Sequence, residues 1–122
     1  MAAVVKYAVE WNCNFQTVQG FSSLNARLNE LLAQTGRSPE SVRRSLMTGC
    51  VFGKDEGALQ EKIAARKRSY EDLRSRGIVV GSPAQVNEQL RELEGSGLQR
   101  LMLQWLDLDD LPGLEALAEA VL

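Results

Sequence analysis

The sequence contains no histidine among its 122 residues. Histidine is the commonest general base and the commonest metal ligand, so Ser–His and Cys–His nucleophile pairs are excluded and most zinc sites are disfavoured. Cysteine is also scarce: Cys13 and Cys50 stand far apart, and no C-x-x-C pair is present. In a reducing compartment, two buried thiols are the simplest interpretation. Both residues fall in predicted strands, which leaves a disulfide between them as the alternative.

Long apolar runs and a large net charge are absent too. The longest apolar stretches, such as Gly77–Gly81, are much shorter than the ~20 residues that a membrane-spanning helix needs. Met1–Val5 lacks the charged start and the long apolar middle of a secretory signal. A net charge of −2 argues against a dedicated binder of nucleic acid or anionic membranes. We therefore expect a cytoplasmic protein with no nucleic-acid or membrane partner.

What is present is the composition of an ordinary soluble domain. Hydrophobic residues make up 44% of the chain and charged residues 25%. The length suits one domain with a single two-layer core and is too short for two domains. No internal repeat, low-complexity segment or linker divides the chain, so we expect residues 1–122 to form a single domain.

Short apolar stretches alternate with amphipathic helices along this domain. Three stretches are predicted to be strands: Glu10–Phe15, Ser45–Phe52 and Leu98–Leu106. Residues 2–9 are predicted to be the tail of a helix, and Gly77–Gly81 is a short apolar segment. Apolar residues at intervals of three and four predict four further helices, over residues 17–36, 55–73, 82–97 and 111–121. In the last of these helices, Leu111, Leu114, Leu117 and Val121 share one face.

Helix-end signals support these boundaries. Thr17, Asp55 and Asp110 are predicted N-caps, and Gly36 is a predicted left-handed stop. Ser82-Pro83-Ala84-Gln85 is a capping box with proline at the first helical position.

The order of these elements predicts the fold class. Strands that are joined through helices are parallel, with right-handed crossovers. We therefore predict an α/β fold, a partial (β/α) TIM barrel with about three parallel strands alternating with helices. Such a sheet has two unpaired edges, and we expect it to expose an inner face rich in Leu, Met and Trp.

Three stretches of the sequence together resemble one protein family. Lys6-Tyr-Ala-Val-Glu-Trp-Asn12 is similar to the segment leading into the sixth barrel strand of luciferase-like oxidoreductases, although Val9 stands where the family usually has Asp. Gly36-Arg-Ser-Pro-Glu40 with Val42-Arg-Arg-Ser45 resembles the turn before the seventh strand. Val80-Gly-Ser-Pro83 through Gly97-Leu-Gln-Arg-Leu-Met-Leu-Gln104 resembles the capped helix and eighth strand. The chain thus looks like the last three strand–helix units of a luciferase-like barrel.

The resemblance implies FMN or a deazaflavin as the cofactor of the parent family. In that family the residues that hold the cofactor lie mostly on the first five strands, which have no counterpart here, so we expect this chain alone to bind neither. The barrel's functional edge is at the carboxyl ends of its strands. Trp11, Asn12 and Trp105 are candidate cofactor-binding residues on this basis. The alternatives are a core anchor for Trp11, a turn former for Asn12 and strand–helix packing for Trp105.

Other candidate sites have simple structural alternatives. Gly81 and Ser82 place backbone amides at a helix N-terminus, which suits an anion, but the capping box already uses some of these amides. Asp107, Asp109 and Asp110 lack the spacing of a calcium loop, so capping by Asp110 is favoured over a metal site. The basic run Arg66-Lys67-Arg68 is favoured as a solvated helix face.

Two functions remain open at this point. The chain is either the C-terminal fragment of a flavin- or deazaflavin-dependent oxidoreductase or monooxygenase, inactive in isolation, or a non-catalytic structural module. In both cases we expect a homo-oligomer formed through the exposed strand edges, for example across a two-fold axis. No catalytic residue and no substrate can be identified from the sequence.

Overall fold

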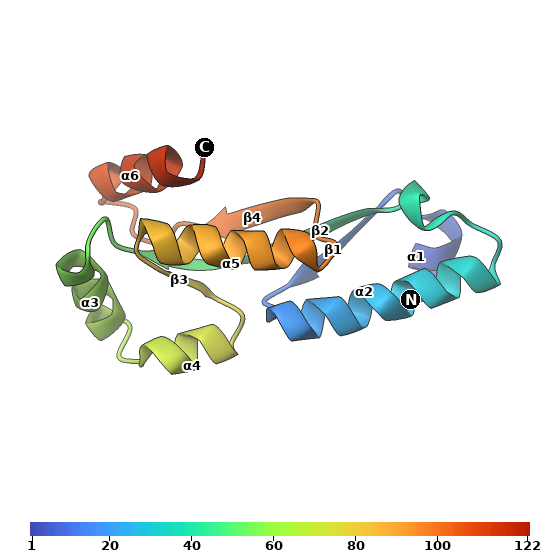
Figure 1. Ribbon diagram of the computed structural model, residues 1–122, viewed down its shortest axis with the longest axis horizontal. Coiled ribbons are helices and arrows are strands. Elements are labelled where there is room, and N and C mark those ends of the chain that lie inside the picture. Colours follow the sequence, from blue (N-terminus) through green and yellow to red (C-terminus); the bar gives the residue numbers. More distant parts are fainter.

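The computed structural model describes all residues, Met1–Leu122. Its sheet is built around one long strand, β2 (Arg43–Phe52), which is flanked by β1 (Glu10–Asn14) and β4 (Arg100–Gln104). Both flanking strands run parallel to β2, and Ser45 is the register partner of Asn12 on one side and of Arg100 on the other. The three long strands therefore lie in chain order, β1-β2-β4, as in an arc of a barrel (Figure 1).

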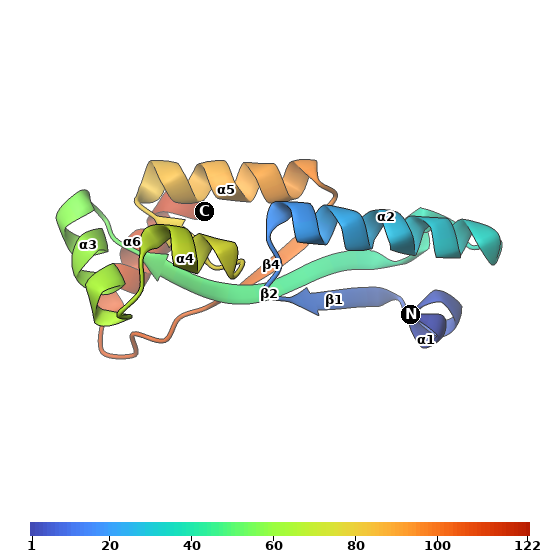
Figure 2. The ribbon, with the colours of Figure 1, turned by 90° about the horizontal axis from the view of Figure 1, so that it is seen from below.

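Helices connect these strands. The helical elements are α1 (Ala2–Tyr7), α2 (Val18–Gln34), a 3-10 turn (Pro39–Ser41), α3 (Glu56–Ala65), α4 (Tyr70–Ser75), α5 (Pro83–Gly95) and α6 (Leu111–Val121). Helix α2 joins β1 to β2, and α5 leads into β4. Figure 2 shows α2 and α5 on the same side of the sheet, while β1 lies at its outer margin. The predicted α/β class and partial (β/α) barrel are confirmed.

A fourth strand, β3 (Val79–Gly81), lies outside this arc. The backbone N–H groups of Arg43 and Gly53, an even number of residues apart, donate to Val9 before β1 and to Gly81 of β3. Because alternate residues of a strand point to opposite edges, β1 and β3 follow one another along the same edge of β2. The sequence analysis described residues 77–81 only as a short apolar segment. The structure adds that part of this segment is a strand, which pairs in parallel with β2.

The predicted helix ends are confirmed in their local chemistry. The side chains of Thr17, Asp55 and Asp110 accept from the backbone N–H groups of Gly20, Ala58 and Gly113. Gly36 has a φ of 77°, the left-handed conformation predicted for it. Pro83 lies in the first turn of α5, whose start forms the predicted capping box.

The predicted helix over residues 55–73 is wrong as one element. It divides into α3 and α4, because Lys67 takes a φ of 55°, which no helix interior accommodates. Ser69 then caps a new helix by accepting from the N–H of Asp72. The signal for this second start was present in the sequence as Ser69-x-x-Asp72.

The core differs between the two ends of the sheet. Near the start of the strands, α2 and α5 cover one face through a cluster that includes Cys13, Phe21, Leu46, Leu93 and Leu98. Near the end of β2 both faces are covered. Cys50, Phe52, Val79, Val86 and Leu117 cluster on the side of α5 and α6, whereas Val51, Leu59, Ile63, Leu73 and Val80 cluster under α3 and α4.

Two further expectations can be compared with the structure. Cys13 and Cys50 are both buried and free, which confirms two buried thiols over a disulfide. The predicted apolar face of α6 is only partly correct, because Leu117 is buried while Leu111 and Leu114 are exposed. No helix is long and apolar enough to cross a membrane.

Candidate functional site

The face of the sheet opposite α2 and α5 is polar. It carries the alternate side chains of the three long strands, which we call the open face: Glu10, Asn12, Asn14, Ser45, Met47, Arg100, Met102 and Gln104. The expectation of an inner face rich in Leu, Met and Trp is therefore wrong. Leu101, Leu103 and Trp105 alternate with these residues and pack toward the helices, and only two methionines remain on the open face.

A hydrogen-bonded network crosses the open face from one edge strand to the other. Ser45 Oγ donates to Glu10 Oε2 at 2.8 Å and accepts from Asn12 Nδ2 at 3.0 Å. Arg100 Nη1 lies 3.6 Å from Glu10 Oε1. Ser45 is fully buried beneath this network, although it lies on the open face. The network holds four polar side chains in fixed positions, which suits a wall that contacts a polar ligand or an ordered water.

The carboxyl ends of the strands hold a second cluster, centred on Lys62 of α3. Lys62 Nζ lies 2.7 Å from Asp110 Oδ2, 3.6 Å from Asp107 Oδ2 and 4.2 Å from the centre of the Trp105 ring. The Trp105 indole N–H donates to the Asp107 carbonyl at 2.9 Å. The hydrogen bond from Lys62, followed by that from the Gly113 N–H, holds the pKa of the Asp110 carboxyl below its usual range. This cluster ties α3 to the loop between β4 and α6.

The Cys50 thiol lies near the same cluster but is not poised to react. Burial raises its pKa to about 12, against the opposing fields of Lys62 and Arg66. Because the thiolate is the nucleophile, a thiol with this pKa is inert at neutral pH. No group of three or more His, Cys, Asp or Glu side chains is arranged to hold a metal ion.

The side chains of Trp11 and Asn12 point to opposite faces of the sheet. Trp11 points toward α2, where its ring stacks on Phe21 with centroids 6.1 Å apart. Asn12 points to the open face and is held by Ser45; it lies within β1 and forms no turn. Trp11 is therefore a core anchor, the alternative given for it above, whereas Asn12 remains a candidate for ligand contact.

Gly81 and Ser82 lie at the junction of β3 and α5. The Ser82 N–H donates to Gln85 Oε1 at 2.9 Å, so this amide is already occupied. A Cβ on Gly81 would collide with the side chain of Gln85 in the same helix start. The glycine is thus required by the close approach of strand and helix, as the capping alternative has it.

Trp105 lies at the carboxyl end of β4, as predicted, but toward the helices. Its ring packs against the core cluster of Cys50 and Phe52, and Lys62 lies over it. The five predicted cofactor residues therefore do not converge on one site. Sequence reasoning missed Lys62, Ser45 and Glu10, whose roles depend on contacts with residues far away in the chain.

The residues of this chain do not by themselves fit a flavin or deazaflavin. The amide at the start of α5 is taken by Gln85, and Lys62 lies over the ring of the one tryptophan near the strand ends. The polar groups available on the open face form only one wall of a cavity.

No protein-family model matches the sequence, and no curated protein matches it. The fold is similar to several solved structures. A coenzyme F420-dependent tetrahydromethanopterin reductase from Methanopyrus kandleri matches with a TM-score of 0.74 and 14% identity, over 97% of this chain and 46% of that chain. A long-chain alkane monooxygenase matches with a TM-score of 0.71 and 14% identity, over 97% and 36% of the two chains. A riboflavin lyase solved with modified FMN and riboflavin matches with a TM-score of 0.72 and 13% identity, over 97% and 38%.

The chain spans less than half the length of these three proteins. At such low identity the likeness establishes the fold, and it agrees with the resemblance seen in the sequence. The chain has the fold of part of the (β/α) barrels of these proteins.

Proposed function

We propose that this chain is the C-terminal segment of a luciferase-like, flavin- or deazaflavin-dependent oxidoreductase or monooxygenase barrel, of which residues 1–122 form the last three strand–helix units. The open face is the observation that supports this proposal. The interior of a (β/α) barrel is usually filled by branched apolar side chains. An interior wall made of Glu10, Asn12, Ser45 and Gln104 suits a barrel that holds a polar ligand instead.

Within such a barrel this segment contributes a wall. Asn14 and Gln104 lie at the carboxyl ends of β1 and β4, where ligands of (β/α) barrels bind, and both point to the open face. When bound, a flavin or deazaflavin supplies the hydride or oxygen chemistry, and the protein positions it. Because this chain offers only one wall, we propose that it is inactive in isolation.

The proposal predicts that FMN or a deazaflavin binds weakly and contacts only the open face. Nuclear magnetic resonance of the isotope-labelled chain, with FMN or a deazaflavin at millimolar concentration, reports which side chains respond. We expect shifts in the side-chain amides of Asn12, Asn14 and Gln104, with no tight complex. The Asn14→Ala and Gln104→Ala variants lose these responses, whereas Asn29→Ala, on the outer helix α2, retains them.

Two results would count against the proposal. Shifts centred on the outer helices, or none at all, would remove the open face as a ligand wall. A stoichiometric yellow complex would overturn the claim that the chain lacks a cofactor site of its own.

A non-catalytic structural module is the second candidate function. The free strand edges of β1 and β4 favour it, because a parallel sheet with open edges is stabilised by further strands. In this case the chain self-associates and shows no response to either cofactor.

A further inference from the structure

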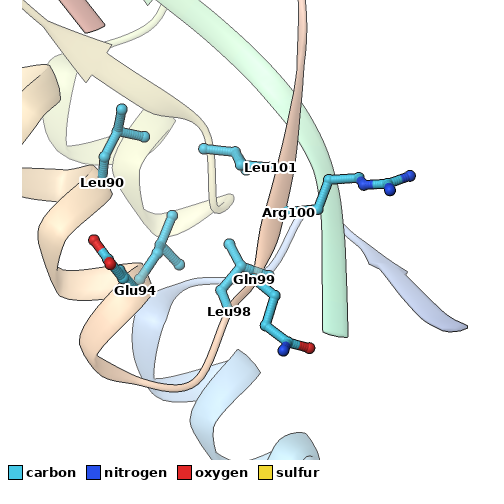
Figure 3. A pocket seen from close by; sticks show the side chains of 7 residues that line it. Leu90, Glu94, Leu98, Gln99, Arg100 and Leu101 are labelled. Atoms are coloured by element: carbon cyan, nitrogen blue, oxygen red, sulfur yellow. The ribbon is translucent and has the colours of Figure 1, made fainter. Parts of the chain in front are cut away.

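The direction of the hydrogen bonds on the open face follows from the groups that form them: Glu10, Asn12, Ser45 and Arg100. Glu10 Oε1 lies 3.6 Å from Arg100 Nη1, and a carboxylate that is paired with a guanidinium can only accept hydrogen bonds. Figure 3 shows Arg100 on the side of β4 opposite Leu101, which lines a hollow against α5. The ion pair therefore belongs to the open face and not to the apolar side of the sheet.

The buried Ser45 hydroxyl transmits this direction. It carries a single proton, and the nearest acceptor is Glu10 Oε2 at 2.8 Å. The Trp11 carbonyl lies farther away, at 3.5 Å. If the proton pointed there, the Ser45 and Glu10 oxygen atoms would lie 2.8 Å apart with no proton between them, which is repulsive. The Ser45 proton is therefore directed to Glu10, and the Ser45 oxygen is left to accept.

This hydroxyl fixes the side-chain amide of Asn12. An amide has one end that donates, Nδ2, and one end that accepts, Oδ1. Because the Ser45 proton is already used, Asn12 turns Nδ2 toward the Ser45 oxygen, at 3.0 Å. Oδ1 then points away from Ser45, and Asn12 is exposed on the open face. The open face therefore presents an acceptor at this position, the amide oxygen, together with at most one remaining N–H.

We propose that Asn12 determines the specificity of the ligand wall by accepting a hydrogen bond from an N–H of the ligand, and that Ser45 and Glu10 are positioning residues that hold it in this orientation. The inference rests on the proposed function, because it names the chemistry that the wall recognises. A neutral donor suits the site, since Glu10 is already paired with Arg100. An imide, in which an N–H stands between two carbonyls, offers this donor and can also accept from the remaining Asn12 N–H. The ring systems of flavins and deazaflavins contain such an imide.

Nuclear magnetic resonance of the isotope-labelled chain without ligand measures the orientation of the Asn12 amide. We expect nuclear Overhauser contacts from the Asn12 Nδ2 protons to the Ser45 β-protons, in a single orientation. Glu10→Gln puts a donor where the carboxylate was, so the Ser45 proton is no longer committed and the Asn12 amide samples both orientations. Glu30→Gln, on the exposed side of α2, removes the same charge and leaves the contacts unchanged. Two orientations of Asn12 in the wild type would overturn the proposal.

Two probes that differ in one N–H test the recognition itself: FMN and 3-methyl-FMN, in which a methyl group replaces the imide proton. Titrations followed through the Asn12 side-chain amide should show that 3-methyl-FMN binds about three- to tenfold more weakly, the effect of one hydrogen bond. In Ser45→Ala and Glu10→Gln, the freed Asn12 amide can instead donate to a carbonyl of the methylated probe, so the difference should fall below about twofold. A purely steric effect of the methyl group would persist in these variants.

The responses of Asn14 and Gln104 separate this inference from the proposed function. If both respond to FMN but Asn12 does not discriminate between the two probes, the inference is wrong and the ligand wall stands. If none of the three side chains responds, the proposed function is wrong, and the assignment of Asn12 to a ligand fails with it. A difference between the probes that persists in the Ser45→Ala and Glu10→Gln variants would overturn the positioning roles, because it would arise without the network.

Discussion

Two glycines with the same backbone conformation allow one tertiary contact to be isolated. Gly36 has a φ of 77° and Gly77 a φ of 79°. A Cβ on Gly36 would meet nothing within 4 Å, whereas a Cβ on Gly77 would lie 2.7 Å from backbone carbons of Phe15 and Gln16. Gly77 precedes β3, and Phe15 and Gln16 follow β1, so the contact joins the two segments that share one edge of β2.

The structure gives a different cost for alanine at each position. An L-residue in the left-handed region costs ~1–2 kcal/mol. Part of this cost is offset because alanine restricts the unfolded chain, by ~0.4–1 kcal/mol. We therefore expect Gly36→Ala to lower the free energy of unfolding by about 1 kcal/mol. Gly77→Ala adds an overpacking cost of ~1–3 kcal/mol, because backbone atoms cannot rotate away as a side chain can.

Urea unfolding at one fixed protein concentration measures both variants against the wild type. We expect Gly77→Ala to lower the free energy of unfolding by about 2–4 kcal/mol, and its melting temperature to fall by ~4 °C for each kcal/mol. Equal effects of the two substitutions would refute the reasoning, because they would show that the entry to β3 does not lie against the end of β1.

Three further predictions follow from buried or paired side chains. The folded protein should react slowly with thiol reagents at pH 8. Because the pKa of Cys50 is raised from 9.0 to about 12, its contribution to stability should be lost as the pH rises between these values, which unfolding at alkaline pH measures. Lys62→Met should raise the pKa of the Asp110 carboxyl toward its usual range, which carbon-detected titration shows, and the stability present above that range should fall less steeply on acidification. Arg44→Lys should lower the free energy of unfolding by about 1–3 kcal/mol, because the buried guanidinium donates to three acceptors that one ammonium cannot reach together; chemical unfolding tests this.

Local chemistry made much of the fold predictable. The caps at Thr17, Asp55 and Asp110 each depend on residues within three positions of one another, so the sequence contains the whole interaction. The break at Lys67 was missed because neither glycine nor proline marks it. The helices before and after this break pack on the same cluster, so their apolar spacing resembles that of one imperfect helix.

The polar face was missed for a different reason. In the strand around Met102, three consecutive apolar residues stand between Arg100 and Gln104, so the sequence alone does not show which alternate set the helices cover. The long-range contacts decide it: Leu101 and Leu103 pack toward α5 and α6, which leaves Arg100 and Gln104 on the other side. The Lys62 cluster was equally hidden, because its acidic partners lie more than forty residues further along the chain.

The two ends of β2 place different demands on the rest of the molecule. Val51, near its carboxyl end, is fully buried under α3 and α4, and its neighbour Phe52 is fully buried under α5 and α6. That end completes its own core within the chain. At the other end the buried Ser45 hydroxyl is hydrogen-bonded to Glu10 and Asn12 of β1, and β1 and β4 each pair only with β2. Because unpaired edges and a polar wall are where further strands or a ligand would add contacts, we expect any completion of this fold to involve β1 and β4 and not its helical layer.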